Sequence, residues 1–81
     1  MQGKRAQPNE NGHLLLKEGE YGMDIRGVWY ARPPGYHMGC LKSHEVTEHD
    51  DGTITVSPSI LISDGDSEWH GYLERGVWRQ V

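Results

Sequence analysis

The chain lacks several of the residues on which small domains rely for stability. Its 81 residues include no phenylalanine and a single cysteine, and 35% of them are hydrophobic. One cysteine excludes an internal disulfide, and a chain of this length forms one thin core rather than two domains. Stability estimates for such short chains come out near zero, so we expect a homo-oligomer, with a dimer as the default symmetry.

Long apolar runs are missing as well. No stretch approaches the roughly 20 apolar residues of a membrane span, and no apolar signal-peptide region follows Lys4 and Arg5. We therefore expect a soluble protein of the cytoplasm without a membrane partner. Lysine and arginine are absent between Lys42 and Arg75, where acidic residues cluster. Because rows of basic side chains bind duplex nucleic acid, the sequence argues against that partner, whereas a small anion needs only one or two arginines.

The sequence also lacks helical periodicity, because apolar residues nowhere recur at helical spacing over three turns. Residues 1–12 are polar and rich in turn residues, and we interpret them as a flexible arm in front of a single β domain at residues 13–81. Short strands are expected near residues 13–17, 28–31, 44–49, 53–57, 60–62 and 69–81. The expected fold is all-β, a small antiparallel β-sandwich or barrel of five or six short strands.

Two hairpins fix the expected core. A turn at Asp50–Gly52, closed by a glycine with positive φ, pairs Val46 with Val56. A three-residue loop at Glu74–Gly76 pairs Leu73 with Val77 and turns His70, Tyr72, Trp78 and Gln80 toward the other face. Both registers separate apolar from polar residues. The expected buried residues are Val46, Ile54, Val56, Ile60, Ile62, Trp69, Leu73 and Val77.

Catalytic and metal motifs are weak. His44 and His49 lie five residues apart, so on a strand they face opposite sides, which excludes the helical zinc-protease signature. His37, Cys40 and His44, with His70, are suitable zinc ligands, but no paired cysteines accompany them, and we expect no metal and no cofactor. No nucleophile elbow, phosphate loop or dinucleotide fingerprint is present, so no catalytic residue is assigned.

The residue types that remain favour binding of a small nucleotide-like ligand. Pro33 and Pro34 stiffen a loop that presents aromatic side chains, and several arginines lie close to tryptophans. Aromatic rings stack on nucleobases, and arginine or serine side chains bind phosphate. The predicted ligand-binding residues are Arg32, Tyr36, His37, Ser57, Ser59, Trp69, His70, Tyr72 and Arg75, of which Arg32, Tyr36 and His70 lie outside the expected core.

The segments Gly52–Leu61, Trp69–Leu73 and Gly76–Arg79 resemble a family of small phage and prophage proteins that often carry the label "ammonia monooxygenase". In typical members, cysteines in an early loop and before the second histidine motif look like a zinc site. Here Pro34 and His37 stand near the first positions, and Trp69 precedes His70. The resemblance implies a β scaffold and a phage context, but no activity.

We therefore expect a phage accessory protein, a binder rather than an enzyme, that holds a nucleotide-like ligand and sequesters a host immune signal in the bacterial cytoplasm. Two alternatives stay open. One is a metal-dependent or general-base hydrolase that uses His37, His44 and His70. The other is a protein-interaction inhibitor of a host factor that acts through the acidic segment at residues 43–68.

Overall fold

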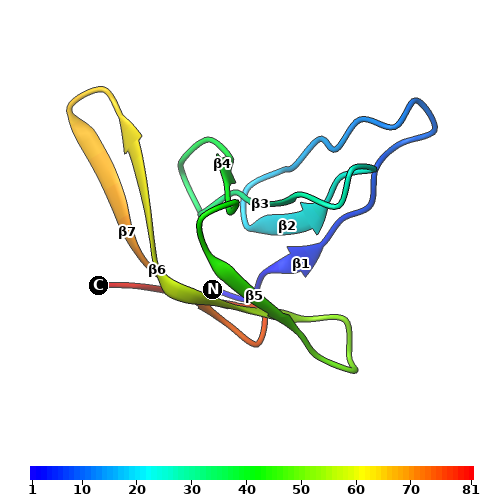
Figure 1. Ribbon diagram of the computed structural model, residues 1–81. Coiled ribbons are helices and arrows are strands. Elements are labelled where there is room, and N and C mark those ends of the chain that lie inside the picture. The colour runs from blue at the N-terminus through cyan, green and yellow to red at the C-terminus, as the bar shows by residue number, and fades with distance from the viewer.

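The computed structural model describes all 81 residues, and it consists of strands and loops without a helix. The strands are β1 (Lys4–Arg5), β2 (Glu20–Met23), β3 (Trp29–Ala31), β4 (Gly39–Cys40), β5 (Glu45–Glu48), β6 (Ile54–Asp64), β7 (Ser67–Glu74) and β8 (Val77–Gln80). They form two four-stranded sheets, β1-β2-β3-β4 and β5-β6-β7-β8, which face each other in Figure 1. The all-β prediction is confirmed, with eight strands instead of five or six and without a closed barrel. None of the chain forms a helix that could cross a membrane.

Two segments near the start of the chain differ from expectation. Lys4 and Arg5, which the composition assigned to a flexible arm, pair in parallel with β2. The Gly3 N–H donates to the Gly76 carbonyl at 2.7 Å, so the start of the chain also meets the β7–β8 turn. Composition does not reveal these partners, because they lie far away in sequence. The strand expected at residues 13–17 is absent, and that segment is part of a loop.

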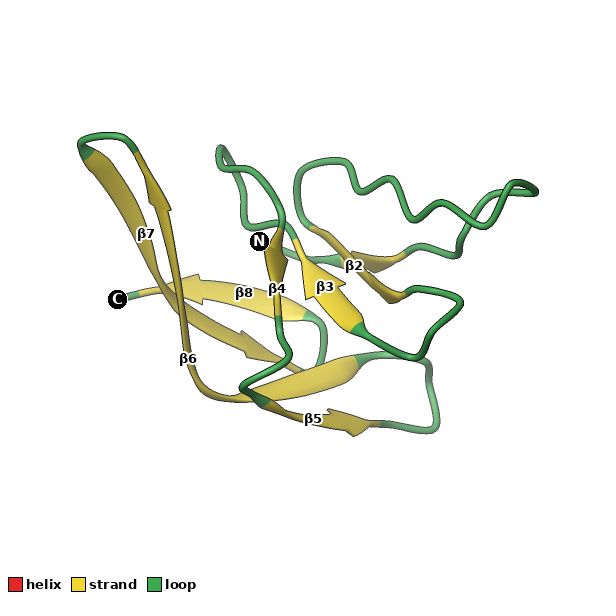
Figure 2. Ribbon diagram, turned by 45° about the horizontal axis from the view of Figure 1, so that its top comes forward, coloured by secondary structure: helices red, strands yellow, loops and turns green.

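The β5–β6 hairpin has the expected register. Val46 pairs with Val56, and the His49 N–H donates to the Thr53 carbonyl at 2.9 Å. Gly52 has the positive φ, 87°, that closes such a turn. The run Ile60–Ile62, expected as a separate strand, continues β6 after an irregularity between Val56 and Ile60. Figure 2 shows β6 bending at this bulge, so that its outer half projects with β7 as a hairpin arm.

The predicted β7–β8 register is wrong by one residue. Leu73 pairs with Trp78 rather than with Val77, because the turn contains two residues instead of three. Arg75 and Gly76 both have positive φ, 47° and 77°, as a type I′ turn requires. A shift of one residue exchanges the two faces of a strand. Trp78 is therefore buried, and Val77 is 42% exposed.

The core lies between the sheets and draws on both. The first sheet and the chain that follows it contribute Tyr21, Ala31 and Leu41, and the second contributes Ile54, Val56, Ile60, Ile62, Trp69, Leu73 and Trp78. Six of the eight residues predicted to be buried are buried, Val46 is half-buried, and Val77 is exposed. The rings of Trp69 and Trp78 meet edge to face at 5.3 Å, and Trp78 Nε1 donates to the Gly19 carbonyl at 2.9 Å.

Candidate functional site

The turn between β2 and β3 is built around the carboxylate of Asp24. One carboxylate oxygen accepts hydrogen bonds from the backbone N–H groups of Arg26 (2.9 Å) and Val28 (3.0 Å). Aspartate often closes turns in this way. The bond from Val28 is the main cause of the lowered pKa of Asp24. The turn holds Ile25 and Arg26 at the end of the hairpin, where both side chains are 74% exposed.

The loop between β1 and β2 folds back along the first sheet. The Asn9 side-chain oxygen accepts a hydrogen bond from the His13 N–H at 2.9 Å, which closes the tip of the loop. The returning chain then alternates in burial, with Leu14 and Leu16 buried and Leu15 73% exposed. In Figure 1 this loop runs along the side of the first sheet that faces away from β5–β8. It therefore covers a sheet face that would otherwise meet solvent.

A groove of about 380 Å³ opens between this loop and the sheet, and we call it the Tyr30 groove. Tyr30 is the middle residue of β3, and its side chain points away from the core because the next residue, Ala31, is fully buried. Aromatic, apolar and charged side chains of both signs line the groove, and the lining residues are Gly12, His13, Leu14, Asp24, Ile25, Arg26, Tyr30 and Met38. Its volume falls in the range of about 300–1,000 Å³ that is usual for small-molecule sites.

The groove contains one guanidinium, Arg26, and one carboxylate, Asp24, which form an ion pair. Arg26 Nη2 lies 3.1 Å from Asp24 Oδ2, and this pairing, followed by the nearby Tyr30, raises the pKa of Arg26. The Asp24 carboxylate already accepts hydrogen bonds from the turn, and its side chain is only 10% exposed. A guanidinium has five N–H donors, so Arg26 keeps donors for a further anion. The groove therefore combines an aromatic ring, apolar walls and an exposed guanidinium that is paired with Asp24 but keeps free donors.

The predicted residues Arg32 and Tyr36 brace a loop instead of facing this groove. Arg32 donates from Nε to the Tyr36 carbonyl at 2.7 Å and from Nη1 to the Leu16 carbonyl at 3.0 Å. The Tyr36 hydroxyl lies 2.6 Å from the Ser67 hydroxyl and donates to the Glu68 carbonyl at 3.1 Å. Residues 32–38, which we call the proline loop, are thereby attached both to the β1–β2 loop and to the β6–β7 hairpin.

His37 makes the second attachment of the proline loop to the hairpin. Its Nδ1 lies 3.0 Å from the Met38 carbonyl oxygen, and its Nε2 lies 2.9 Å from the Ser63 carbonyl oxygen. The hydrogen bonds to Met38 and then to Ser63 are the largest causes of the raised pKa of His37. The ring thus lies at a contact between the proline loop and β6.

Four predicted residues share the outer side of β6 and β7, away from the core. The Ser59 hydroxyl lies 2.8 Å from His70 Nε2, and the Ser59 carbonyl oxygen lies 3.1 Å from His44 Nε2. Ser57 is exposed on the same strand, and Tyr72 is 37% exposed beneath the Arg79 guanidinium, which lies 5.2 Å from its ring centre. This outer-face cluster lies opposite the proline loop, because Tyr36 bonds to Ser67, on the same side of β7 as the buried Trp69.

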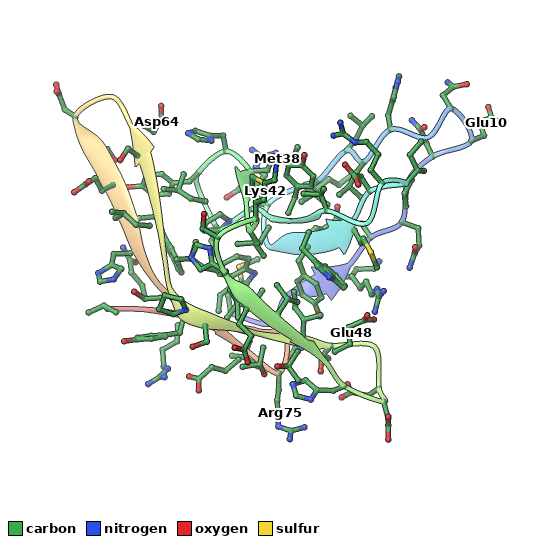
Figure 3. All side chains as sticks on the ribbon, in the orientation of Figure 1. Glu10, Met38, Lys42, Glu48, Asp64 and Arg75 are labelled. Carbon is green, nitrogen blue, oxygen red and sulfur yellow. The ribbon has the colours of Figure 1, made fainter.

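The structure separates the remaining predicted residues from both groups. Trp69 is 3% exposed and packs on Trp78, so it is a core residue. Arg75 lies in the β7–β8 turn beside the acidic β5–β6 turn, on the far side of the molecule from Met38 in Figure 3. The nine predicted residues therefore do not line one pocket.

The acidic segment and the candidate metal ligands are also divided. Glu48 and Asp64, both labelled in Figure 3, lie at opposite ends of the second sheet, so the acidic residues form two patches instead of one. His37 contacts the hairpin on its inner side, whereas His70 lies on the outer side. No three His, Cys, Asp or Glu side chains gather where they could hold a metal ion. The expectation that the chain binds no metal stays a prediction.

Sequence reasoning missed the groove residues His13, Arg26, Tyr30 and Met38. Two signals were available for them. Alternation in the strand at residues 28–31 places Tyr30 opposite Ala31, and Arg26 precedes Trp29 by three residues. Neither signal shows that the loop at residues 12–14 covers this face. The chain as a whole has no match among protein-family models, curated proteins or solved structures.

Proposed function

We propose that the protein binds a small, anionic, nucleotide-like ligand in the Tyr30 groove. The observation that carries the proposal is one open groove of about 380 Å³ that combines the Tyr30 ring, apolar walls and the exposed Arg26 guanidinium. Stacking on an aromatic side chain contributes roughly 1–3 kcal/mol per base in single-strand binders. Arginine adds charge-assisted hydrogen bonds to phosphate. The groove thus offers both kinds of contact that a nucleotide needs.

The biological setting is part of the proposal. The resemblance to small phage and prophage proteins supports an accessory role in the cytoplasm of a host bacterium, where the protein would sequester an immune signal. The thin core and the exposed Leu61, Tyr72 and Val77 support a homo-oligomer, because a second copy could cover such side chains. Light scattering of the full chain at micromolar concentration tests the oligomer, and a monomer mass would contradict it.

The ligand proposal is tested by isothermal titration calorimetry of the full chain with AMP, UMP and cyclic di-AMP. We expect at least one of them to bind, and we expect Arg26→Gln to weaken that binding at least tenfold, which corresponds to about 1.4 kcal/mol. Arg79→Gln is the matched control, because it removes the same charge from the outer side of the second sheet. Absence of binding by the wild type, or equal losses in both variants, would refute the proposal.

The hydrogen bond between Ser59 and His70 supports a second candidate function, a serine hydrolase with a general base. A histidine within about 2.6–3.2 Å of a serine hydroxyl is the arrangement that activates the serine as a nucleophile. Ser59 Oγ would attack the carbonyl carbon of an ester while His70 Nε2 takes the hydroxyl proton. His70 would then protonate the departing alcohol, and water would hydrolyse the acyl-serine.

The test for this second function is the release of p-nitrophenol from p-nitrophenyl acetate. The hydrolase function predicts a burst that disappears in Ser59→Ala and in His70→Ala. Ser57→Ala is the matched control, since it removes a neighbouring exposed hydroxyl from the same strand. If the Ser59→Ala variant keeps the wild-type rate, this function is excluded and binding alone remains.

A further inference from the structure

We propose that protonation of His37 controls the Tyr30 groove by fixing the wall that Met38 forms. This inference rests on the proposed ligand-binding function and assigns a regulation to the same site. Met38 is the residue where the two features meet. Its side chain lines the groove, and its backbone carbonyl oxygen lies 3.0 Å from His37 Nδ1. A change at the His37 ring therefore acts on the groove through one shared residue.

The two contacts of the His37 ring are satisfied together only when the ring carries a positive charge. Both ring nitrogens face carbonyl oxygens, with Nδ1 at 3.0 Å from Met38 O and Nε2 at 2.9 Å from Ser63 O. A carbonyl oxygen only accepts hydrogen bonds, so both nitrogens must donate. A neutral imidazole has one N–H, and only the imidazolium has two. When the ring loses its proton, one of these contacts becomes a repulsion between two lone pairs and must open.

Opening either contact loosens the groove wall. Loss of the Met38 contact removes the bond between the His37 ring and the wall residue itself, although β4, which follows Met38, stays paired with β3. Loss of the Ser63 contact detaches the proline loop from β6 and leaves the Tyr36 hydroxyl as the remaining side-chain bond from the loop to the hairpin. Arg32 still ties the loop to the Leu16 carbonyl on its other side. The proline loop therefore stays attached to the first sheet, while its contact with the hairpin becomes weaker.

The charges around His37 come from all the elements that pack on it. Asp64 of β6 raises the pKa of His37, and Arg32 of the proline loop lowers it, while the two carbonyl contacts have the larger effect. Glu68 of β7 is a further charged group near this contact, because its carboxylate accepts a hydrogen bond from the hydroxyl of Ser63 in β6 at 3.4 Å. The contributions that raise the pKa of His37 outweigh those that lower it, so the folded protein favours the imidazolium. One of the two carbonyl contacts of His37 is therefore lost as the pH rises through the neutral range, where histidine is the usual side chain to titrate.

The experiment follows the three methionines by NMR of the full chain labelled at the methionine methyl groups. We expect the Met38 methyl signal to shift between about pH 5.5 and 8 with the midpoint of the His37 ring, which is read from its own ¹⁵N signals. The signals of Met1 and Met23 are internal controls. The Met38 shift should vanish in His37→Gln, because glutamine does not titrate, and it should persist in His49→Gln, whose ring bonds Thr55 at 2.7 Å on another hairpin.

Calorimetry with AMP over the same pH range provides the second readout. We expect the Kd of the wild type to rise about fivefold or more toward pH 8, at the lower end of ordinary coupling between sites, and the Kd of His37→Gln to change less. If the chemical shift of the Met38 methyl group does not change with the titration of His37, the inference is overturned, whether or not AMP binds. If the Met38 signal follows His37 but no nucleotide binds at any pH, the coupling stands and the proposed function fails.

Discussion

Replacing Trp78 tests the arrangement of the second sheet most directly, because its position depends on the two-residue β7–β8 turn. Trp78 is 3% exposed, and its neighbour Val77 is 42% exposed. A three-residue turn would exchange these environments. The structure therefore predicts a large loss of stability for Trp78→Ala and a small one for Val77→Ala.

The size of the effect follows from the contacts of the indole. Truncating a buried tryptophan to alanine costs about 3–5 kcal/mol. The edge-to-face contact with Trp69 contributes about 0.5–1.5 kcal/mol of this, and the Nε1 bond to the Gly19 carbonyl contributes a similar amount. Val77→Ala, at an exposed position, is expected to stay within about 0.5 kcal/mol. A domain of this length has a free energy of unfolding of roughly 4–12 kcal/mol, so Trp78→Ala removes a large share of it.

Trp78→Phe provides a milder version of the same test, for the case in which the alanine variant does not fold. Phenylalanine keeps an aromatic ring in the core, but it is smaller than the indole and removes one of the two donors to the Gly19 carbonyl, which keeps the Lys4 N–H, so we expect a loss of about 1–3 kcal/mol. The measurement is urea unfolding followed by circular dichroism, with the midpoint and slope compared between variants. A Val77→Ala loss as large as that of Trp78→Phe would refute the register and the placement of Trp78 in the core.

Three further predictions concern the proline loop, the β2–β3 turn and the metal content of the protein. Arg32→Ala should lower the free energy of unfolding by about 1–3 kcal/mol, and Arg32→Lys should restore only part of it, because an ammonium cannot reach the carbonyls of Leu16 and Tyr36 together; urea unfolding measures both. The lowered pKa of Asp24 contributes stability above the ordinary aspartate pKa that is lost as the pH falls through the folded value, so acid titrations of the wild type and Asp24→Asn should converge at low pH. Purified protein should hold less than about half an equivalent of zinc after dialysis, and stoichiometric zinc that disappears in Cys40→Ala would contradict this.

The sequence predicts the β5–β6 hairpin well because the information is local. Asp51 accepts hydrogen bonds from the N–H and hydroxyl of Thr53, and Gly52 supplies the positive φ, so the turn carries its own register. The β7–β8 turn carries no such signal. Arginine seldom adopts a positive φ, and a three-residue loop that ends in glycine fits the same residues equally well. One ambiguous turn is enough to exchange Val77 and Trp78.

The Tyr30 groove could not be predicted from the sequence, for a different reason. Its floor and its walls come from segments far apart in the chain, and the Asn9 turn that folds one wall over Tyr30 is only a local motif in the sequence. Arg32 is the opposite case, a residue that was predicted to bind a ligand but has a structural role. Its type and its neighbours suggest an anion site, but the carbonyls of Leu16 and Tyr36 use its donors. A side chain's partners decide its role, and pattern reasoning does not identify distant partners.

The contact between residues 1–3 and residues 76–78 has a consequence for how the chain folds during synthesis. The Gly3 N–H bonds to the Gly76 carbonyl, and the Trp78 N–H bonds to the Met1 carbonyl at 2.8 Å, so this seam joins the first residues to some of the last. Ribosomes add about 5–20 residues per second, so the first residues wait roughly 4–16 s before residue 78 is made. The local β5–β6 and β6–β7 hairpins can form as they emerge, whereas the seam closes only after translation has passed it.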